Sequence, residues 1–153
     1  MPRVQREAHV TWAGNLARGR GKISAATGAF EDLPYSLATR VERPDGKTSP
    51  EELLAAAHAA CYAMSLAGEL VNVGSAPEHV DVRATVTLDE VEGGSHRIVS
   101  SNVLARARAT GMDETALQRV AETASEGCPF SALIAASGRV TVKATLEGGT
   151  NGD

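Results

Sequence analysis

The chain contains two cysteines, and both lie where a thiol could do chemistry. Cys61 lies in the small-residue segment HAACYAM, residues 58–64, and Cys128 lies in EGCPF, residues 126–130. Two thiols in one chain suggest a redox pair, in which one sulfur attacks an oxidant and the other resolves the product as a disulfide. The alternative is two buried structural cysteines, because free cysteine is among the most buried residue types. Composition alone leaves both interpretations open.

A reactive cysteine needs surroundings that lower its pKa, because the thiolate is the nucleophile. Cys61 is expected in the middle of an apolar helix, where burial raises the pKa, so it needs a cation from another segment. Cys128 precedes Pro129, a residue favoured in the first turn of a helix. A helix beginning there would place its positive end near this sulfur. A buried thiol beside a supplied arginine would make a tunable attacker, and a second thiol at a helix break would make a plausible resolving partner.

Glu51 lies ten residues before Cys61 on the same predicted helix. Ten residues correspond to a rise of roughly 15 Å, and the two side chains differ in direction by about 80°. Glu51 therefore cannot touch the Cys61 of its own helix. Either it is a first-turn acid that suits the helix dipole, or it serves a site elsewhere, including one in a second copy of the chain.

His58 precedes Cys61 by three residues, which places it on a neighbouring face of the helix. It could act as a base, but a packed or hydrogen-bonded histidine is the favoured interpretation. Met64 and Phe130 are expected to form pocket wall or core.

The length of 153 residues suits a single domain, 1–153, with residues 148–153 as a frayed tail. Aromatic residues make up only 3% of the chain, so the core must be built from aliphatic side chains. A net charge of −4 argues against a nucleic-acid binder, which needs a basic surface. There is no set of residues with the spacing of a zinc site. We expect no metal and no organic cofactor.

The N-terminus is polar and lacks the apolar region of a signal peptide. The most apolar run, residues 53–73, contains His58, Glu69 and Asn72, and no membrane-spanning segment is expected. The expected location is the cytoplasm, where a disulfide is usually catalytic or redox-sensing.

The strongest helix signal begins at Pro50. Ser49 is a candidate N-cap, proline fits the first helical position, and Glu51 follows in the first turn. Nearly every residue from 53 to 67 is small or apolar, so this long helix, ending near Gly74, is expected to be buried on most sides.

Alternating patterns and turn signals predict the remaining elements. The predicted strands are 8–12, 20–25, 35–41, 80–88, 97–109 and 139–146, and the further helices are 114–126, capped by Asp113, and 129–136. This order favours an α+β protein with helices on a mostly antiparallel sheet.

Several of these segments resemble one known family. Residues 50–61, PEELLAAAHAAC, are similar to the helix signature of the osmotically inducible protein C (OsmC) and organic hydroperoxide resistance (Ohr) superfamily. Residues 127–129, GCP, resemble its second cysteine motif. The resemblance also includes WAG at 12–14, RGRG at 18–21 and PYSLATR at 34–40, and it covers all but the last few residues. The motif HAAC and the pair Thr39-Arg40 resemble the OsmC branch more closely than the Ohr branch.

The resemblance implies an OsmC-like intertwined homodimer with a long central helix and two active sites built from both chains. It implies a cysteine-based peroxidase that reduces organic hydroperoxides to alcohols in oxidative or osmotic stress defence. Cys61 matches the peroxidatic cysteine and Cys128 the resolving one, so a Cys61 sulfenic acid and a Cys61–Cys128 disulfide are implied. Arg40 matches the arginine that stabilises the thiolate, and Glu51 the carboxylate that orients it. The implied reductant is a thiol donor, a dithiol or a lipoylated protein.

Two alternatives stay open. In the Ohr branch the arginine comes from the early loop, here Arg18-Gly19-Arg20-Gly21, whose glycines would allow a close approach to a substrate. We favour Arg40 and keep Arg20 as the alternative. The rival function is a non-catalytic small-molecule-binding or stress-interaction protein on the same fold, with structural cysteines.

Overall fold

The computed structural model describes residues 3–148. The predicted tail at 148–153 therefore lies, apart from Gly148, outside the described residues. The chain forms two compact units, one up to Leu53 and one from Leu54 onwards.

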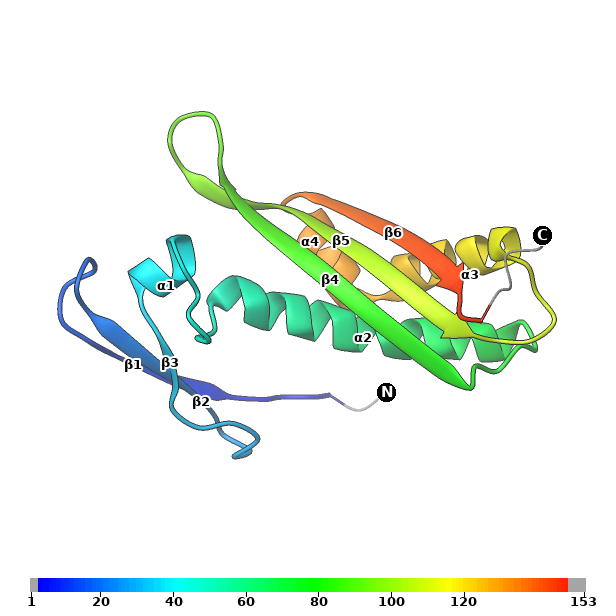
Figure 1. Ribbon diagram of the computed structural model, residues 1–153, viewed down its shortest axis with the longest axis horizontal. Helices are drawn as coiled ribbons and strands as arrows, with labels where there is room; N and C mark the ends of the chain where they lie inside the picture. Colours follow the sequence, from blue (N-terminus) through cyan, green and yellow to red (C-terminus); the bar gives the residue numbers. More distant parts are fainter. Residues whose placement is uncertain (1–2, 149–153) are drawn as a thin grey trace. The chain divides into compact units, whose positions relative to one another are not determined.

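The first unit contains an antiparallel sheet in the order β1-β2-β3 (Figure 1). Its strands are β1 (Ala8–Ala13), β2 (Arg20–Ala25) and β3 (Leu33–Tyr35). The first two were predicted from their alternating patterns. The rings of Trp12 and Tyr35 pack together across this sheet, with centroids 5.6 Å apart.

The third predicted strand, 35–41, is wrong for most of its length. The strand ends at Tyr35, and a short helix, α1 (Leu37–Val41), follows. The Ser36 hydroxyl accepts the Thr39 N–H at 3.2 Å, and the Thr39 hydroxyl accepts the Ser36 N–H at 2.9 Å. This reciprocal capping box satisfies two N–H groups at the helix start and outweighs the alternation of apolar residues. Arg40 therefore lies on a helix and not on a strand.

The long helix α2 (Pro50–Asn72) begins where the sequence predicts. The hydroxyl of Ser49 accepts the backbone N–H of Glu52 at 3.1 Å, as a capping residue should. In a single chain, only one stripe of α2 is buried, formed by residues four positions apart. The prediction that this helix is buried on most sides is wrong. The buried stripe consists of His58, Tyr62, Leu66 and Leu70.

The opposite face of α2 is apolar and exposed. Met64 is 78% exposed and Val71 57%, so Met64 is neither pocket wall nor core in this chain. The reason is that one sheet and one neighbouring helix cover a single face of α2.

By length and composition alone, α2 is apolar enough to cross a membrane, contrary to the expectation that no segment qualifies. Alanine and leucine outweigh its few polar residues. The core helix of a soluble protein passes the same test, so this property is weak evidence for a membrane.

The second unit contains a sheet in the order β4-β5-β6, with β4 (His79–Glu90), β5 (His96–Arg108) and β6 (Arg139–Leu146). The hairpin of β4 and β5 is antiparallel, as predicted, whereas β6 runs parallel to β5. Two helices, α3 (Glu114–Gly127) and α4 (Pro129–Ala135), lie between β5 and β6 in the chain. The expectation of an α+β protein with mostly antiparallel sheets is confirmed.

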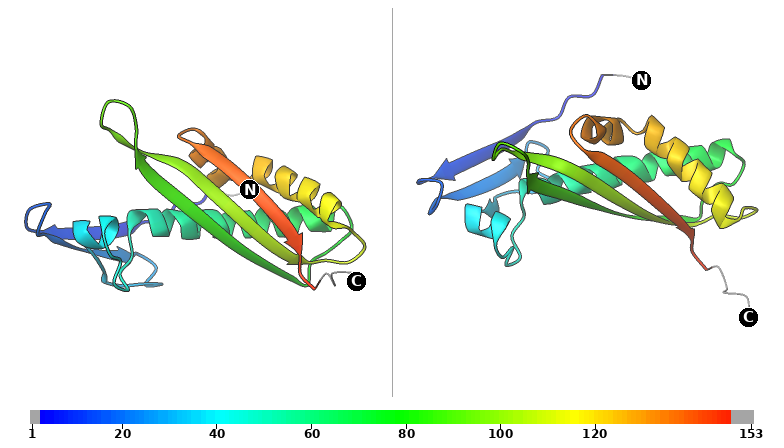
Figure 2. Two further views of the ribbon diagram at one scale, coloured as in Figure 1. Left: turned by 45° about the horizontal axis from the view of Figure 1, so that its top comes forward. Right: turned by 90° about the horizontal axis from the view of Figure 1, so that it is seen from above.

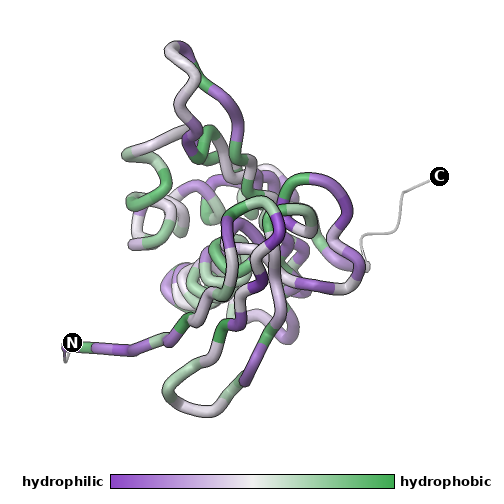
Figure 3. The backbone as a smooth tube through the Cα atoms, turned by 90° about the vertical axis from the view of Figure 1, so that its left-hand side faces the viewer, coloured by the Kyte–Doolittle hydropathy of each residue, from purple (hydrophilic) through white to green (hydrophobic). Residues whose placement is uncertain are grey.

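The core of this unit lies where α2 and α3 pack on one face of the sheet (Figures 1 and 2). The Tyr62 hydroxyl donates to the carbonyl of Ala121 at 2.9 Å and thereby joins the two helices. Phe130 packs against the core, as predicted. The burial of residues alternates along β4 and along the second half of β5, and Figure 3 shows the backbone coloured by hydropathy. The buried aliphatic residues of this core cluster are Leu66, Leu70, Val103, Ala105, Ala107, Leu117, Ala121, Ala124 and Ala144.

Candidate active site

The four predicted site residues form two pairs, one in each unit. Arg40 and Glu51 meet in the first unit, and Cys61 and Cys128 meet in the second.

Arg40 and Glu51 form a two-pronged ion pair. The Arg40 Nε donates to both carboxylate oxygens of Glu51 at 3.1 Å, and its Nη2 donates to Oε1 at 2.5 Å. This is the geometry in which an arginine is held in one orientation. The predicted contact between these two residues is therefore present, on the α1 helix and the first turn of α2.

The pair shifts the pKa of both partners toward the charged forms. Burial alone would raise the pKa of Glu51, but the hydrogen bond from Arg40 lowers it overall. The same hydrogen bond raises the pKa of Arg40. The two groups are thus charged together at neutral pH.

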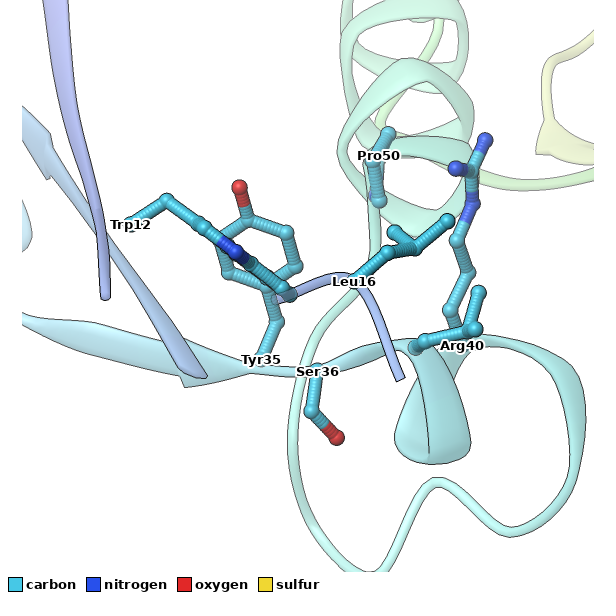
Figure 4. A pocket seen from close by; sticks show the side chains of 7 residues that line it. Trp12, Leu16, Tyr35, Ser36, Arg40 and Pro50 are labelled. Atoms are coloured by element: carbon cyan, nitrogen blue, oxygen red, sulfur yellow. The ribbon is translucent and has the colours of Figure 1, made fainter. Parts of the chain in front are cut away.

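Arg40 lies at the edge of an apolar cavity of about 370 Å³ in the first unit. Figure 4 shows the side chain of Arg40 extending past Leu16 toward Pro50 at the start of α2. The lining is mostly aromatic and aliphatic, with one cation. The lining residues are Trp12, Leu16, Tyr35, Ser36, Leu37, Arg40 and Pro50.

The glycines predicted to let the early loop approach a substrate have another role in the structure, which is to leave room for aromatic rings. A Cβ on Gly21 would run into the ring of Tyr35, and one on Gly19 would lie 2.6 Å from Nε1 of Trp12. These glycines therefore make room for the aromatic wall of the cavity. Arg20 is exposed and lines a neighbouring cavity instead.

We expect Glu51→Gln to destabilise the fold by about 1 kcal/mol at neutral pH, a value discounted for solvent screening because Arg40 is 35% exposed. The folded-state pKa of Glu51 is lowered, so its contribution is fully present above the ordinary pKa. It is lost as the pH falls through the lower, folded value. Urea denaturation of wild type and variant at about pH 7 and about pH 3 measures this. A stability gap that is equal at both pH values would contradict the prediction.

The two cysteines come from α2 and from the junction of α3 and α4. Cys61 is partly exposed, whereas Cys128 is 1% exposed and lies between the last residue of α3 and the first of α4. Burial, followed by the neighbouring Cys128, raises the pKa of the Cys61 thiol, outweighing the backbone N–H of Phe130. Within one chain, the surroundings of Cys61 therefore favour the thiol over the thiolate.

The surroundings of Cys128 lower the pKa of its thiol. Burial alone would raise its pKa, but the N–H and hydroxyl groups of Ser131, together with Cys61, lower it overall. The sequence predicted that the surroundings of Cys128 favour a thiolate more than those of Cys61 do, because a helix begins at Pro129.

His58 is fully buried and hydrogen-bonded on both sides, as its favoured interpretation predicted. Its Nδ1 lies 2.7 Å from Oγ of Ser101, and its Nε2 lies 2.8 Å from Oγ of Ser131. Burial lowers the pKa of the imidazole, which is therefore neutral at neutral pH.

Sequence reasoning missed the two serines that hold this histidine. Ser131 had a usable signal, because it stands three residues after Cys128 at the start of a helix. Ser101 had none, because it is 43 residues from His58 in the chain. The residues that wall the cavity beside Arg40 were also missed as a group.

Known proteins resemble this chain over most of its length. The family model of OsmC-like proteins matches residues 43–143. Peroxiredoxin OsmC of Escherichia coli (strain K12) is 34% identical over 133 residues, covering 87% of this chain and 92% of that protein. An organic hydroperoxide resistance protein of Xanthomonas axonopodis pv. citri (strain 306) is 30% identical over 144 residues, covering 91% and 92%.

Solved structures share the fold. The organic hydroperoxide resistance protein OhrB of Bacillus subtilis superposes with a TM-score of 0.67 at 26% identity, covering 92% of this chain and 98% of that one. An OsmC-like protein from Mycoplasma pneumoniae gives a TM-score of 0.70 at 13% identity, which supports the fold alone, over 94% and 97% of the two chains. The matched family model, the two relatives and the shared α+β fold show that this chain belongs to the OsmC/Ohr family.

Proposed function

We propose that this protein is a cysteine-based peroxidase that reduces organic hydroperoxides to alcohols in stress defence. The observation that carries the proposal is the meeting of Cys61 and Cys128, from segments far apart in sequence, in a chain 34% identical to a peroxiredoxin. Two adjacent thiols can supply both electrons that the reduction of a peroxide requires.

The proposed reaction begins when the Cys61 thiolate attacks the distal peroxide oxygen. The O–O bond breaks, the alcohol leaves, and Cys61 becomes a sulfenic acid. Cys128 then attacks this sulfur, which gives a Cys61–Cys128 disulfide and water. A thiol donor, either a dithiol or a lipoylated protein, returns both cysteines to thiols.

Arg40 is the proposed source of the cation that Cys61 needs, and Glu51 holds it in place. The two-pronged contact supports this choice over Arg20, because an arginine fixed in one orientation stabilises a thiolate better than a free one. Glu51 and Cys61 stand ten residues apart on one continuous helix. We therefore assign the Arg40 that faces each Cys61 to the partner subunit.

An intertwined homodimer follows from this assignment. The exposed apolar face of α2, with Ala56, Ala60 and Met64 on successive turns, suits close packing against a second copy. In this proposal the two compact units act together as one OsmC-like domain, and the protein works in the cytoplasm.

The cavity beside Arg40 supports alkyl hydroperoxides as substrates. Its aromatic and aliphatic walls would bury an alkyl group, while the guanidinium faces the polar peroxide end. Each buried methylene contributes about 0.8 kcal/mol, which corresponds to roughly a fourfold gain in rate constant for each added carbon.

The test is to add one equivalent of peroxide to the fully reduced protein and count thiols within seconds. Loss of two thiols per chain, with a Cys61–Cys128 link in the peptide map, is the expected result. Rate constants should rise from hydrogen peroxide through alkyl hydroperoxides of increasing length. Unchanged thiols would overturn the proposal and favour a binding protein with structural cysteines.

A further inference from the structure

The catalytic scheme above does not use His58, although this residue is placed close to the cysteine pair. Ser101, His58 and Ser131 are three polar side chains of the second unit that are 0%, 0% and 3% exposed. Burying polar groups in an aliphatic core is unfavourable unless each is hydrogen-bonded. Here the three side chains hydrogen-bond to one another and form a polar chain inside the core.

This chain of hydrogen bonds ends at Ser131, three residues after Cys128. Ser101 Oγ lies 2.7 Å from Nδ1 of His58, and Ser131 Oγ lies 2.8 Å from Nε2. Ser131 stands in the first turn of α4, the helix that begins directly after Cys128, and its polar groups lie close enough to this cysteine to lower the pKa of the thiol. One hydroxyl group therefore stands between the imidazole and the second cysteine. Ser131 also accepts a hydrogen bond from the hydroxyl of Ser125 at 3.3 Å.

The position of each hydrogen along this path depends on the state of Cys128. When Cys128 is a thiol, its S–H can donate to Ser131 Oγ while the Ser131 hydroxyl donates to Nε2. When Cys128 is a thiolate, the Ser131 hydroxyl can turn to donate to the sulfur while Nε2–H donates to Ser131. A hydroxyl group can serve in both directions because it donates one hydrogen and accepts others.

We propose that the Ser101–His58–Ser131 chain takes the proton of Cys128 while this residue attacks the oxidised Cys61. Ser131 is the residue that contacts the reacting sulfur, and His58 is a positioning residue that acts through it. Ser101 holds the Nδ1 side of the ring, so that Nε2 faces Ser131. The inference rests on the proposed peroxidase function, and it concerns the step in which the disulfide forms.

The atoms and electrons of this step balance without a further reactant. The S–H bond of Cys128 and the S–O bond of the Cys61 sulfenic acid break, and the S–S bond forms. The Cys128 sulfur is oxidised, and the Cys61 sulfur is reduced from the sulfenic to the disulfide level. The Cys128 proton passes to Ser131 as Ser131 gives its own proton to Nε2 of His58. His58 then returns a proton through Ser131 to the leaving hydroxide, which becomes water, and the ring is neutral again.

The surroundings of His58 suit a group that accepts a proton only transiently. The groups that face it from β5 and α4 are the neutral hydroxyls of Ser101 and Ser131. The titratable groups at the far end of the path are Cys128 and, next to it, Cys61. Burial lowers the pKa of His58, so the ring is neutral and able to accept at neutral pH, and it returns the proton readily.

Single-turnover kinetics with cumene hydroperoxide separate the two steps. Loss of the Cys61 thiol reports the attack on peroxide, and disulfide formation reports the attack by Cys128. In His58→Gln and Ser131→Ala, the first rate should stay at the wild-type value while the second falls about a hundredfold. Sulfenic acid should then accumulate and be trapped by dimedone. Raising the pH should restore the second rate, because bulk base then removes the Cys128 proton.

Ser137→Ala is the matched control. It removes a partly buried hydroxyl in the same unit, one that donates to the carbonyl of Ile98 at 2.8 Å and has no part in the path. Both of its rates should equal those of the wild type. His58→Gln keeps hydrogen-bonding atoms toward both serines, so it decides the question even where Ser131→Ala does not fold.

Two results would overturn the inference. One is an unchanged rate of disulfide formation in the folded variants. The other is an equal slowing of both steps without alkaline recovery, which is the result of a merely structural role. Failure of the proposed function looks different, because the wild-type protein itself would then form neither sulfenic acid nor disulfide.

Discussion

Replacing Cys61 with serine is expected to lower the turnover of cumene hydroperoxide on the order of 10³-fold or more. A serine hydroxyl is not ionised near neutral pH, and oxygen cannot form the sulfenic acid on which the scheme depends. A steady-state assay with a dithiol as reductant measures the loss. Retention of full turnover by Cys61→Ser would show that the scheme is wrong.

Cys128→Ser is the matched control for this experiment, because it removes the other thiol by the same change. This variant should still lose one thiol per chain with one equivalent of peroxide, and it should accumulate a Cys61 sulfenic acid that dimedone traps. It should form no disulfide within the chain. If Cys128→Ser instead lost all reactivity while Cys61→Ser kept it, the roles of the two cysteines would be reversed. The lower pKa of Cys128 within one chain makes this comparison necessary.

The second large effect concerns Arg40. We expect Arg40→Met to reduce the rate of attack on peroxide about 10²- to 10³-fold, the usual cost of removing one group that stabilises a developing or fixed charge at an active site. The raised pKa of Cys61 within a single chain is the physical reason, since its own surroundings favour the thiol. Stopped-flow measurement of Cys61 oxidation checks this value. Arg20→Met, on the exposed alternative arginine, should have a small effect.

Mixing two inactive variants tests whether the site is shared between subunits. Arg40→Met and Cys61→Ser chains are each expected to be inactive as homodimers. If the partner subunit's Arg40 serves Cys61, a hybrid dimer contains one site with both residues intact and one with neither. Random exchange should then restore roughly a quarter of the wild-type activity, because half the dimers are hybrids with one working site of two.

No recovery from the mixture, under conditions where subunit exchange is verified by mass, would place both residues in the same chain's site. That outcome would contradict the intertwined assignment but not the peroxidase reaction. Glu51→Gln in place of Arg40→Met should behave in the same way with a smaller loss, because Glu51 acts by holding Arg40.

Much of the fold could be predicted because its signals are local. Ser49 and Asp113 cap the helices that follow them, and each accepts a backbone N–H three residues further on. The strands of the second unit were found from their alternation of apolar and polar residues, because one face of the sheet is buried. The error at 35–41 arose from two local signals in conflict, and the capping box formed by Ser36 and Thr39 prevailed.

The sequence by itself was enough to identify the family, to single out both cysteines as candidate redox residues and to predict the contact between Arg40 and Glu51. Each of these features belongs to a short sequence motif. Only the tertiary structure decided that β6 runs parallel to β5 and that one face of α2 stays exposed in a single chain. It also decided the partners of His58, which come from 43 and 73 residues away. Contacts within a few residues follow from local chemistry, whereas a partner at such separations is chosen by how the sheet and helices pack, and no local pattern specifies that choice.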